Sequence, residues 1–147
     1  MHECMAFTFE IPDEHCLSVH EIGEEEAQRY KWIESEKAGR DLGETAIRSW
    51  IRHHWNGFLR HRWIEHLEGK TFWIELDQGD FGLLKRAFKD SPLIDTILAK
   101  LKHGEENLHI INWALDMMHP MDEVHEILLT LDVNSRRIEC LFIPDYY

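Results

Sequence analysis

The sequence predicts a mainly α-helical protein of the α+β type. Five to six helices are expected around one long central helix, with a small antiparallel sheet formed by the N- and C-terminal segments. Apolar residues recur every three or four positions through most of the chain, and one such run, 41–67, is unusually long. Alternation typical of strands occurs only near the two ends. Without internal repeats or linkers, residues 1–147 are expected to form a single domain.

Composition places the chain among ordinary folded proteins. Of its 147 residues, 44% are hydrophobic and 30% are charged, so it can bury a core without a structural metal or disulfide. No apolar run approaches the roughly 18 residues that a membrane span requires. The first residues lack the basic and apolar regions of a secretory signal. Three cysteines, an odd number, disfavour a disulfide framework. These features together predict a cytoplasmic protein.

The first forty residues are expected to form a β-hairpin followed by a helix. Phe7, Phe9 and Ile11 alternate with polar or small residues, residues 12–14 resemble a turn, and the alternation resumes so that the hairpin covers 5–22. An acidic run then opens a helix over 24–38, which Gly39 ends.

The long helix follows, with Asp41 as its expected N-cap and Glu44 completing a capping box. Its apolar stripe consists of Ile47, Ile51, Trp55, Leu59, Trp63 and Leu67. A separate polar stripe contains Arg48, Arg52, Asn56 and Arg60. Because the tryptophans lie on the apolar stripe, they are expected to anchor the core rather than to contact a ligand.

The second half of the chain predicts further helices over 80–88, 91–103, 105–118 and 120–131. In the third of these, Leu108, Ile111, Ala114 and Leu115 are the expected buried residues. Residues 71–76 fit either a strand or a helix, and residues 138–143 predict a final strand.

A metal site is one hypothesis for the long helix. His54, His61 and Glu65 point in nearly one direction at 100° per residue, and imidazole with carboxylate suits Zn, Fe or Mn. Asp122 and His125 could supply further ligands from a later helix. The alternative is an amphipathic helix whose histidines bond to neighbouring groups.

A second cluster of metal-ligand residue types lies near the N-terminus. It comprises His2, Cys4, His15, Cys16 and His20. No Cys-x-x-Cys pair occurs among them, so their spacing matches no zinc knuckle. Cys16 and Cys140 are more simply explained as small core residues.

Charge is unevenly distributed along the chain. Residues 37–66 hold six basic and three acidic side chains, whereas the whole chain has a formal charge of −12. Either an anionic partner or internal neutralisation would explain this asymmetry. The candidate interaction residues are Arg40, Arg48, Arg52 and Arg60, and the corner around Ser35, Glu36 and Asp41 could also face a partner. The acidic remainder disfavours nucleic acid and anionic lipid.

No catalytic motif is present. The sequence contains no Gly-x-Ser-x-Gly, phosphate-binding glycine loop or dinucleotide fingerprint, and Asp77 with Asp80 fits a turn as well as a carboxylate pair. Whether the protein is an enzyme is left open. The first hypothesis is a protein-interaction or regulatory module that binds a protein partner or forms a homodimer, without a cofactor. The alternative is a metal-binding protein or metalloenzyme that uses one transition-metal ion on the long helix.

Overall fold

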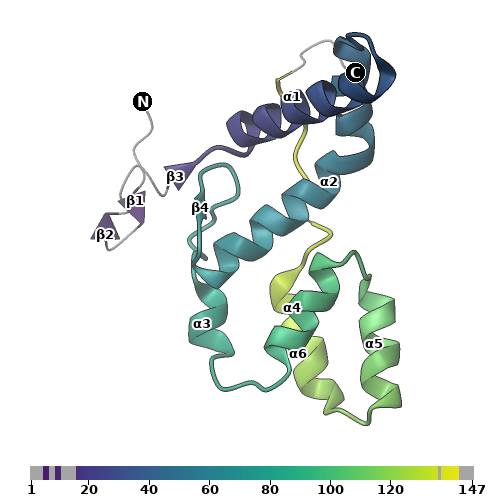
Figure 1. Ribbon diagram of the computed structural model, residues 1–147. Coiled ribbons are helices and arrows are strands. Elements are labelled where there is room, and N and C mark those ends of the chain that lie inside the picture. Colours follow the sequence, from purple (N-terminus) through teal and green to yellow (C-terminus); the bar gives the residue numbers. More distant parts are fainter. Residues whose placement is uncertain (1–4, 7–8, 11–15, 136, 143–147) are drawn as a thin grey trace.

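The computed structural model describes residues 5–6, 9–10, 16–135 and 137–142, and within these it contains six α-helices and four strands of two residues (Figure 1). The helices are α1 (Val19–Ala38), α2 (Glu44–Glu68), α3 (Leu83–Ala87), α4 (Ile94–Lys102), α5 (Asn107–Asp116) and α6 (Met121–Leu131). The strands are β1 (Met5–Ala6), β2 (Phe9–Glu10), β3 (Cys16–Leu17) and β4 (Phe72–Trp73). The prediction of a mainly helical protein is confirmed. None of the described helices combines the length and the apolar character needed to cross a membrane.

The described residues do not form the predicted sheet. β1 pairs antiparallel with β2, and β3 pairs in parallel with β4 from the middle of the chain. Residues 138–142 are not a strand. They run along α2 instead, where the indole Nε1 of Trp55 donates to the carbonyl of Ile138 over 2.8 Å. The antiparallel sheet joining the two ends is therefore not confirmed, because the described C-terminal segment packs on a helix rather than on the N-terminal strands.

α1 begins earlier than expected. The predicted hairpin extended to residue 22, but the hydroxyl of Ser18 accepts hydrogen bonds from the backbone N–H groups of His20 and Glu21 and starts the helix there. The carboxylate of Glu75 also accepts from the N–H of Val19 over 2.9 Å. A serine cap and an adjacent carboxylate both stabilise a helix N-terminus, and they outweigh the strand-like alternation of this segment.

α2 covers 25 residues and contacts α1, α3, α4 and β4. Trp50, Trp55 and Trp63 are buried in the core, and for Trp55 and Trp63 this follows from their place on the predicted apolar stripe. The expected capping box is absent, since the N-cap is Gly43, which has no side chain that could accept a hydrogen bond. Asp41 accepts instead from the N–H of Gly43 and fixes the turn before the helix.

Small residues let α1 approach α2 closely. Gly23 and Ala27 are buried on α1, and a Cβ added at Gly23 would lie 2.8 Å from the ring of Trp55. α1 lies beside the N-terminal half of α2, while α4, α5 and α6 gather near its other end, with α5 on the outside (Figure 1). α5 packs on both α6 and α4.

Candidate functional site

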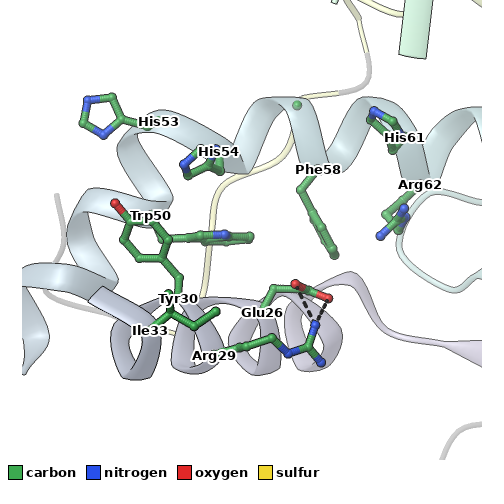
Figure 2. A pocket seen from close by; sticks show the side chains of 11 residues that line it. Glu26, Arg29, Tyr30, Ile33, Trp50, His53, His54, Phe58, His61 and Arg62 are labelled. Carbon is green, nitrogen blue, oxygen red and sulfur yellow. Dashed lines mark hydrogen bonds and ion pairs between the residues drawn. The ribbon is translucent and has the colours of Figure 1, made fainter. Parts of the chain in front are cut away.

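A cleft with a volume of about 580 Å³ lies between α1 and α2 (Figure 2). α1 contributes residues spaced by three and four positions, so that they share one helix face, and α2 does the same. The lining residues are Glu26, Arg29, Tyr30 and Ile33 from α1, and Trp50, His53, His54, Gly57, Phe58, His61 and Arg62 from α2. Pockets of about 300–1,000 Å³ are typical of small-molecule sites.

Aromatic rings form the inner wall of this cleft. Trp50 and Phe58 meet edge to face with their centroids 5.7 Å apart, and Tyr30 lies 5.6 Å from the ring of His54. In Figure 2, Phe58 and Arg62 extend from α2 toward α1. The guanidinium of Arg62 lies 4.9 Å from the centre of the Phe58 ring, a cation–π contact.

The polar groups of the cleft are partly fixed by local bonds. Arg29 forms an ion pair with Glu26 over 3.2 Å, and Arg62 pairs with Glu65. Within the described part of the chain, His54 makes ring contacts but no hydrogen bond. Its imidazole is therefore available to a ligand.

Two of the histidines in the cleft have a defined tautomer when neutral. The Nδ1 of His53 donates to the carbonyl of Ser49 over 2.9 Å, and the Nε2 of His61 donates to the carbonyl of Lys102 over 2.8 Å. A carbonyl can only accept, so each ring carries its proton on the bonded nitrogen. The other nitrogen of each imidazole keeps its lone pair.

Gly57 interrupts the surface of α2 at the rim of the cleft. A Cβ added there would meet no atom within 4 Å, so packing does not require a glycine. Glycine in a helix interior costs roughly 0.5–1 kcal/mol relative to alanine. The fold therefore carries an unfavourable residue at a position where alanine would fit.

A buried histidine organises a second cluster at the C-terminal end of α2. His66 is fully buried, its Nε2 lies 3.0 Å from Asp77 and 3.5 Å from Asp80, and its Nδ1 accepts from the backbone N–H of Trp73 over 3.1 Å. Among the described residues, one group of possible metal ligands has its ligand atoms all within 4.8 Å of one another. It consists of His66, Asp77 and Asp80.

The hydrogen bonds around His66 favour a structural role over metal binding. Because Nδ1 accepts from an N–H, the ring proton must be on Nε2, where it is donated to Asp77. In a metal-binding histidine, the nitrogen that faces the ligand group has no proton and binds the metal, while the other nitrogen donates to a carbonyl or carboxylate. In His66 the nitrogen that faces the carboxylates carries the proton instead. Asp77 also accepts from the N–H of Gly79, and Asp80 accepts from that of Gln78. The cluster therefore fastens the loop 69–82 to α2.

The metal ligands predicted on the long helix are not brought together. His54 and His61 both line the cleft, but Glu65 is paired with Arg62, and the three do not form a group within 4.8 Å among the described residues. Asp122 and His125 are exposed on α6 and take part in no such group either.

The N-terminal cluster falls largely outside the described residues, which exclude His2, Cys4 and His15. Cys16 is disulfide-bonded, which the odd number of cysteines had disfavoured, whereas Cys140 is buried in the core. The ring of His20 stacks on Trp55 with centroids 5.7 Å apart.

The four candidate interaction arginines have different environments. Arg60 is mostly buried and pairs with Glu106 over 3.0 Å, so its charge is neutralised internally. Arg48 pairs with Glu44 on the surface. Arg40 and Arg52 are exposed and have no ion-pair partner in the described part of the chain. A hollow at the α1–α2 corner is lined by Lys31, Trp32, Ser35, Glu36, Gly39, Arg40 and Asp41.

Exposed apolar side chains gather on α5, α6 and the turn between them. Leu108 and Leu115 were expected to be buried but are exposed, whereas Ala114 is buried as predicted and Ile110 is buried beside it in the core. α5 has apolar residues on more than one face, and only one face meets the core. The exposed large apolar residues of this region are Leu108, Leu115, Met117, Met118 and Leu129.

His66 and the exposed leucines of α5 were both missed by the sequence reasoning. A signal for His66 exists, because it lies three residues after Trp63 and therefore on the apolar stripe of α2, where a polar group needs a partner.

In comparisons with protein families, curated proteins and solved structures, no match to this chain was found.

Proposed function

We propose that this protein is an interaction module whose α5–α6 hairpin binds a basic, amphipathic segment of a partner protein. The binding surface consists of Leu108, Leu115, Met118 and Leu129 with the neighbouring carboxylates, and it is called the acidic–apolar surface below. The observation that carries the proposal is the exposure of these large apolar side chains on a hairpin that holds no lysine or arginine.

The apolar side chains of this surface are large and strongly exposed. Met118 is 89% exposed, Leu129 79% and Leu108 66%. Leu108 and Leu115 are seven residues apart on α5, which places them two turns apart on one face. Exposed apolar residues that share a face and are bordered by polar groups are typical of protein-interaction sites.

The negative charge of the hairpin favours a positively charged partner. Residues 103–135 contain no lysine or arginine, and their seven acidic residues are Glu105, Glu106, Asp116, Asp122, Glu123, Glu126 and Asp132. Asp116, Asp122 and Glu126 are exposed and have no ion-pair or hydrogen-bond partner among the described residues. Asp122 and Glu126 also share one face of α6 with Leu129.

A basic amphipathic helix satisfies both requirements at once. Its apolar side chains would cover the leucines and Met118, and its lysines or arginines would pair with the carboxylates of α6. Helix binding to an apolar groove through residues at i, i+3, i+4 and i+7 is a recurrent mode of peptide recognition. Methionine suits such a surface because its unbranched side chain adapts to different partners.

Isothermal titration calorimetry with three synthetic peptides tests the proposal. The first peptide is a leucine–lysine sequence with all leucines on one helical face, the second replaces every lysine with glutamate, and the third keeps the leucine–lysine composition but spreads the leucines around the helix. We expect the first to bind most tightly and its affinity to fall as salt is raised, since exposed charges are screened over about 8–10 Å at physiological ionic strength. Equal binding of all three peptides, or none, would contradict the proposal.

Leu115→Ser is the matching variant, with Leu141→Ser as its control. Both leucines are similarly exposed, at 55% and 60%, but Leu141 lies outside the hairpin. Loss of a central apolar contact is expected to weaken binding of the first peptide by about tenfold, or about 1.4 kcal/mol. If Leu115→Ser self-associates less than the wild type in sedimentation, the surface binds a second copy of the chain, and the peptide-like partner is ruled out.

A further inference from the structure

The cleft between α1 and α2 contains a feature that the fold itself does not explain. Gly57 is in the middle of a 25-residue helix, where glycine is disfavoured, yet a Cβ added there would contact no atom from outside the helix backbone within 4 Å. A glycine is expected where another molecule approaches the backbone closely. His53 and His61 lie one turn before and one turn after it, so the bare backbone of Gly57 is flanked by two imidazoles.

The cleft differs in charge from the rest of the protein. Its lining contains two arginines and three histidines but only one carboxylate, that of Glu26, in a chain with a net charge of −12. His54 can donate to an anionic oxygen, and so can the N–H groups of Arg29 and Arg62 that do not bind Glu26 or Glu65. This end of the molecule therefore suits an anion, unlike the α5–α6 hairpin.

The inner wall of the cleft suits a flat apolar body. Trp50, Phe58 and Tyr30 present ring faces or edges within a volume of about 580 Å³. Aromatic rings pack favourably on one another in offset or edge-to-face arrangements. Arg62, which already lies over the rings of Phe58 and Trp73, shows that a planar cation is accommodated at one end of this wall.

We propose that the α1–α2 cleft binds a small planar aromatic molecule that bears a carboxylate. The ring system packs on Trp50 and Phe58, the carboxylate accepts hydrogen bonds from His54 and the arginines, and the edge of the ligand passes close to the backbone at Gly57. This site is independent of the acidic–apolar surface, because the two share no residue.

Titration with 1-naphthoate and its neutral isostere 1-naphthamide tests the ligand class. Heteronuclear NMR spectra of the full chain report binding through the side-chain signals of Trp50 and the histidines of the cleft. We expect 1-naphthoate to shift these signals and to bind at least about fivefold more tightly than 1-naphthamide. Absence of binding, or equal binding of acid and amide, would overturn the proposal.

Gly57→Leu tests the site, and Asn56→Leu is its control at the adjacent exposed position. Asn56 does not line this cleft, so a leucine there leaves it open. We expect Gly57→Leu to melt no lower than the wild type and to lose 1-naphthoate binding, whereas Asn56→Leu retains it. His54→Ala, which removes an exposed side chain, is a second variant should the leucine disturb the helix, and it is expected to weaken binding several-fold. Unchanged binding in Gly57→Leu or in His54→Ala would place the ligand elsewhere and contradict the assignment.

Discussion

At the scale of single residues, the hydrogen bonds of His66 decide its role. The sequence places this residue on the apolar stripe of α2 but does not reveal its partners, because Asp77 and Trp73 reach it through a loop whose path depends on tertiary packing. The buried Nδ1 accepts from a backbone N–H, and the buried Nε2 donates to a carboxylate. Both ring nitrogens are therefore satisfied without a metal ion.

Comparing His66→Ala with Asp77→Asn tests whether the cluster depends on its hydrogen bonds or on the negative charge of Asp77. Removing the imidazole leaves a cavity and an unpaired buried N–H at Trp73, so the free energy of unfolding should fall by about 2–5 kcal/mol. In Asp77→Asn the new amide oxygen could still accept from His66, so this substitution should cost less than about 1.5 kcal/mol, the usual net value of one hydrogen bond. Urea denaturation measures both. A larger loss in Asp77→Asn than in His66→Ala would show that the negative charge itself is needed.

At the scale of elements, the helices were more predictable than the strands. Periodicity identified α2 and α6 within a few residues, and the burial of Trp55 and Trp63 follows directly from their place on the apolar stripe. The start of α1 was not predictable, because its capping depends on Glu75, which is 57 residues away from Ser18. The strands contain only two residues each, too few for an alternation pattern to be recognised.

Ser18→Ala tests how much this long-range cap contributes to α1. The substitution removes a side chain that accepts from two backbone N–H groups and donates to Glu75. Thermal and urea unfolding should show a loss of about 1–2 kcal/mol, the usual range for an N-cap serine. Thr96→Ala, at an exposed position on α4, is the control and should change the free energy of unfolding by less than about 0.5 kcal/mol. Equal effects of the two substitutions would mean that the cap does not hold α1 in place.

At the scale of the whole molecule, opposite charges occupy different regions. The sequence showed the basic segment 37–66, and the structure shows that Arg60 is neutralised by Glu106, whereas Arg40 and Arg52 are exposed. The cleft between α1 and α2 could not be predicted, since it forms beside the close contact that Gly23 allows between the two helices. The exposure of the α5 leucines could not be predicted either. Several faces of α5 are apolar, and only its packing on α4 and α6 determines which face is buried.

The central claim, that the acidic–apolar surface binds a basic amphipathic segment, is tested most directly by methyl NMR spectra of the full chain with the one-faced leucine–lysine peptide. The methyl signals of Leu108, Leu115, Met118 and Leu129 should shift together on addition of the peptide. Those of Leu141 and Ile33, which are exposed outside the hairpin, should remain unchanged. Shifts confined to Leu141 and Ile33, or spread evenly over all exposed methyl groups, would contradict the claim.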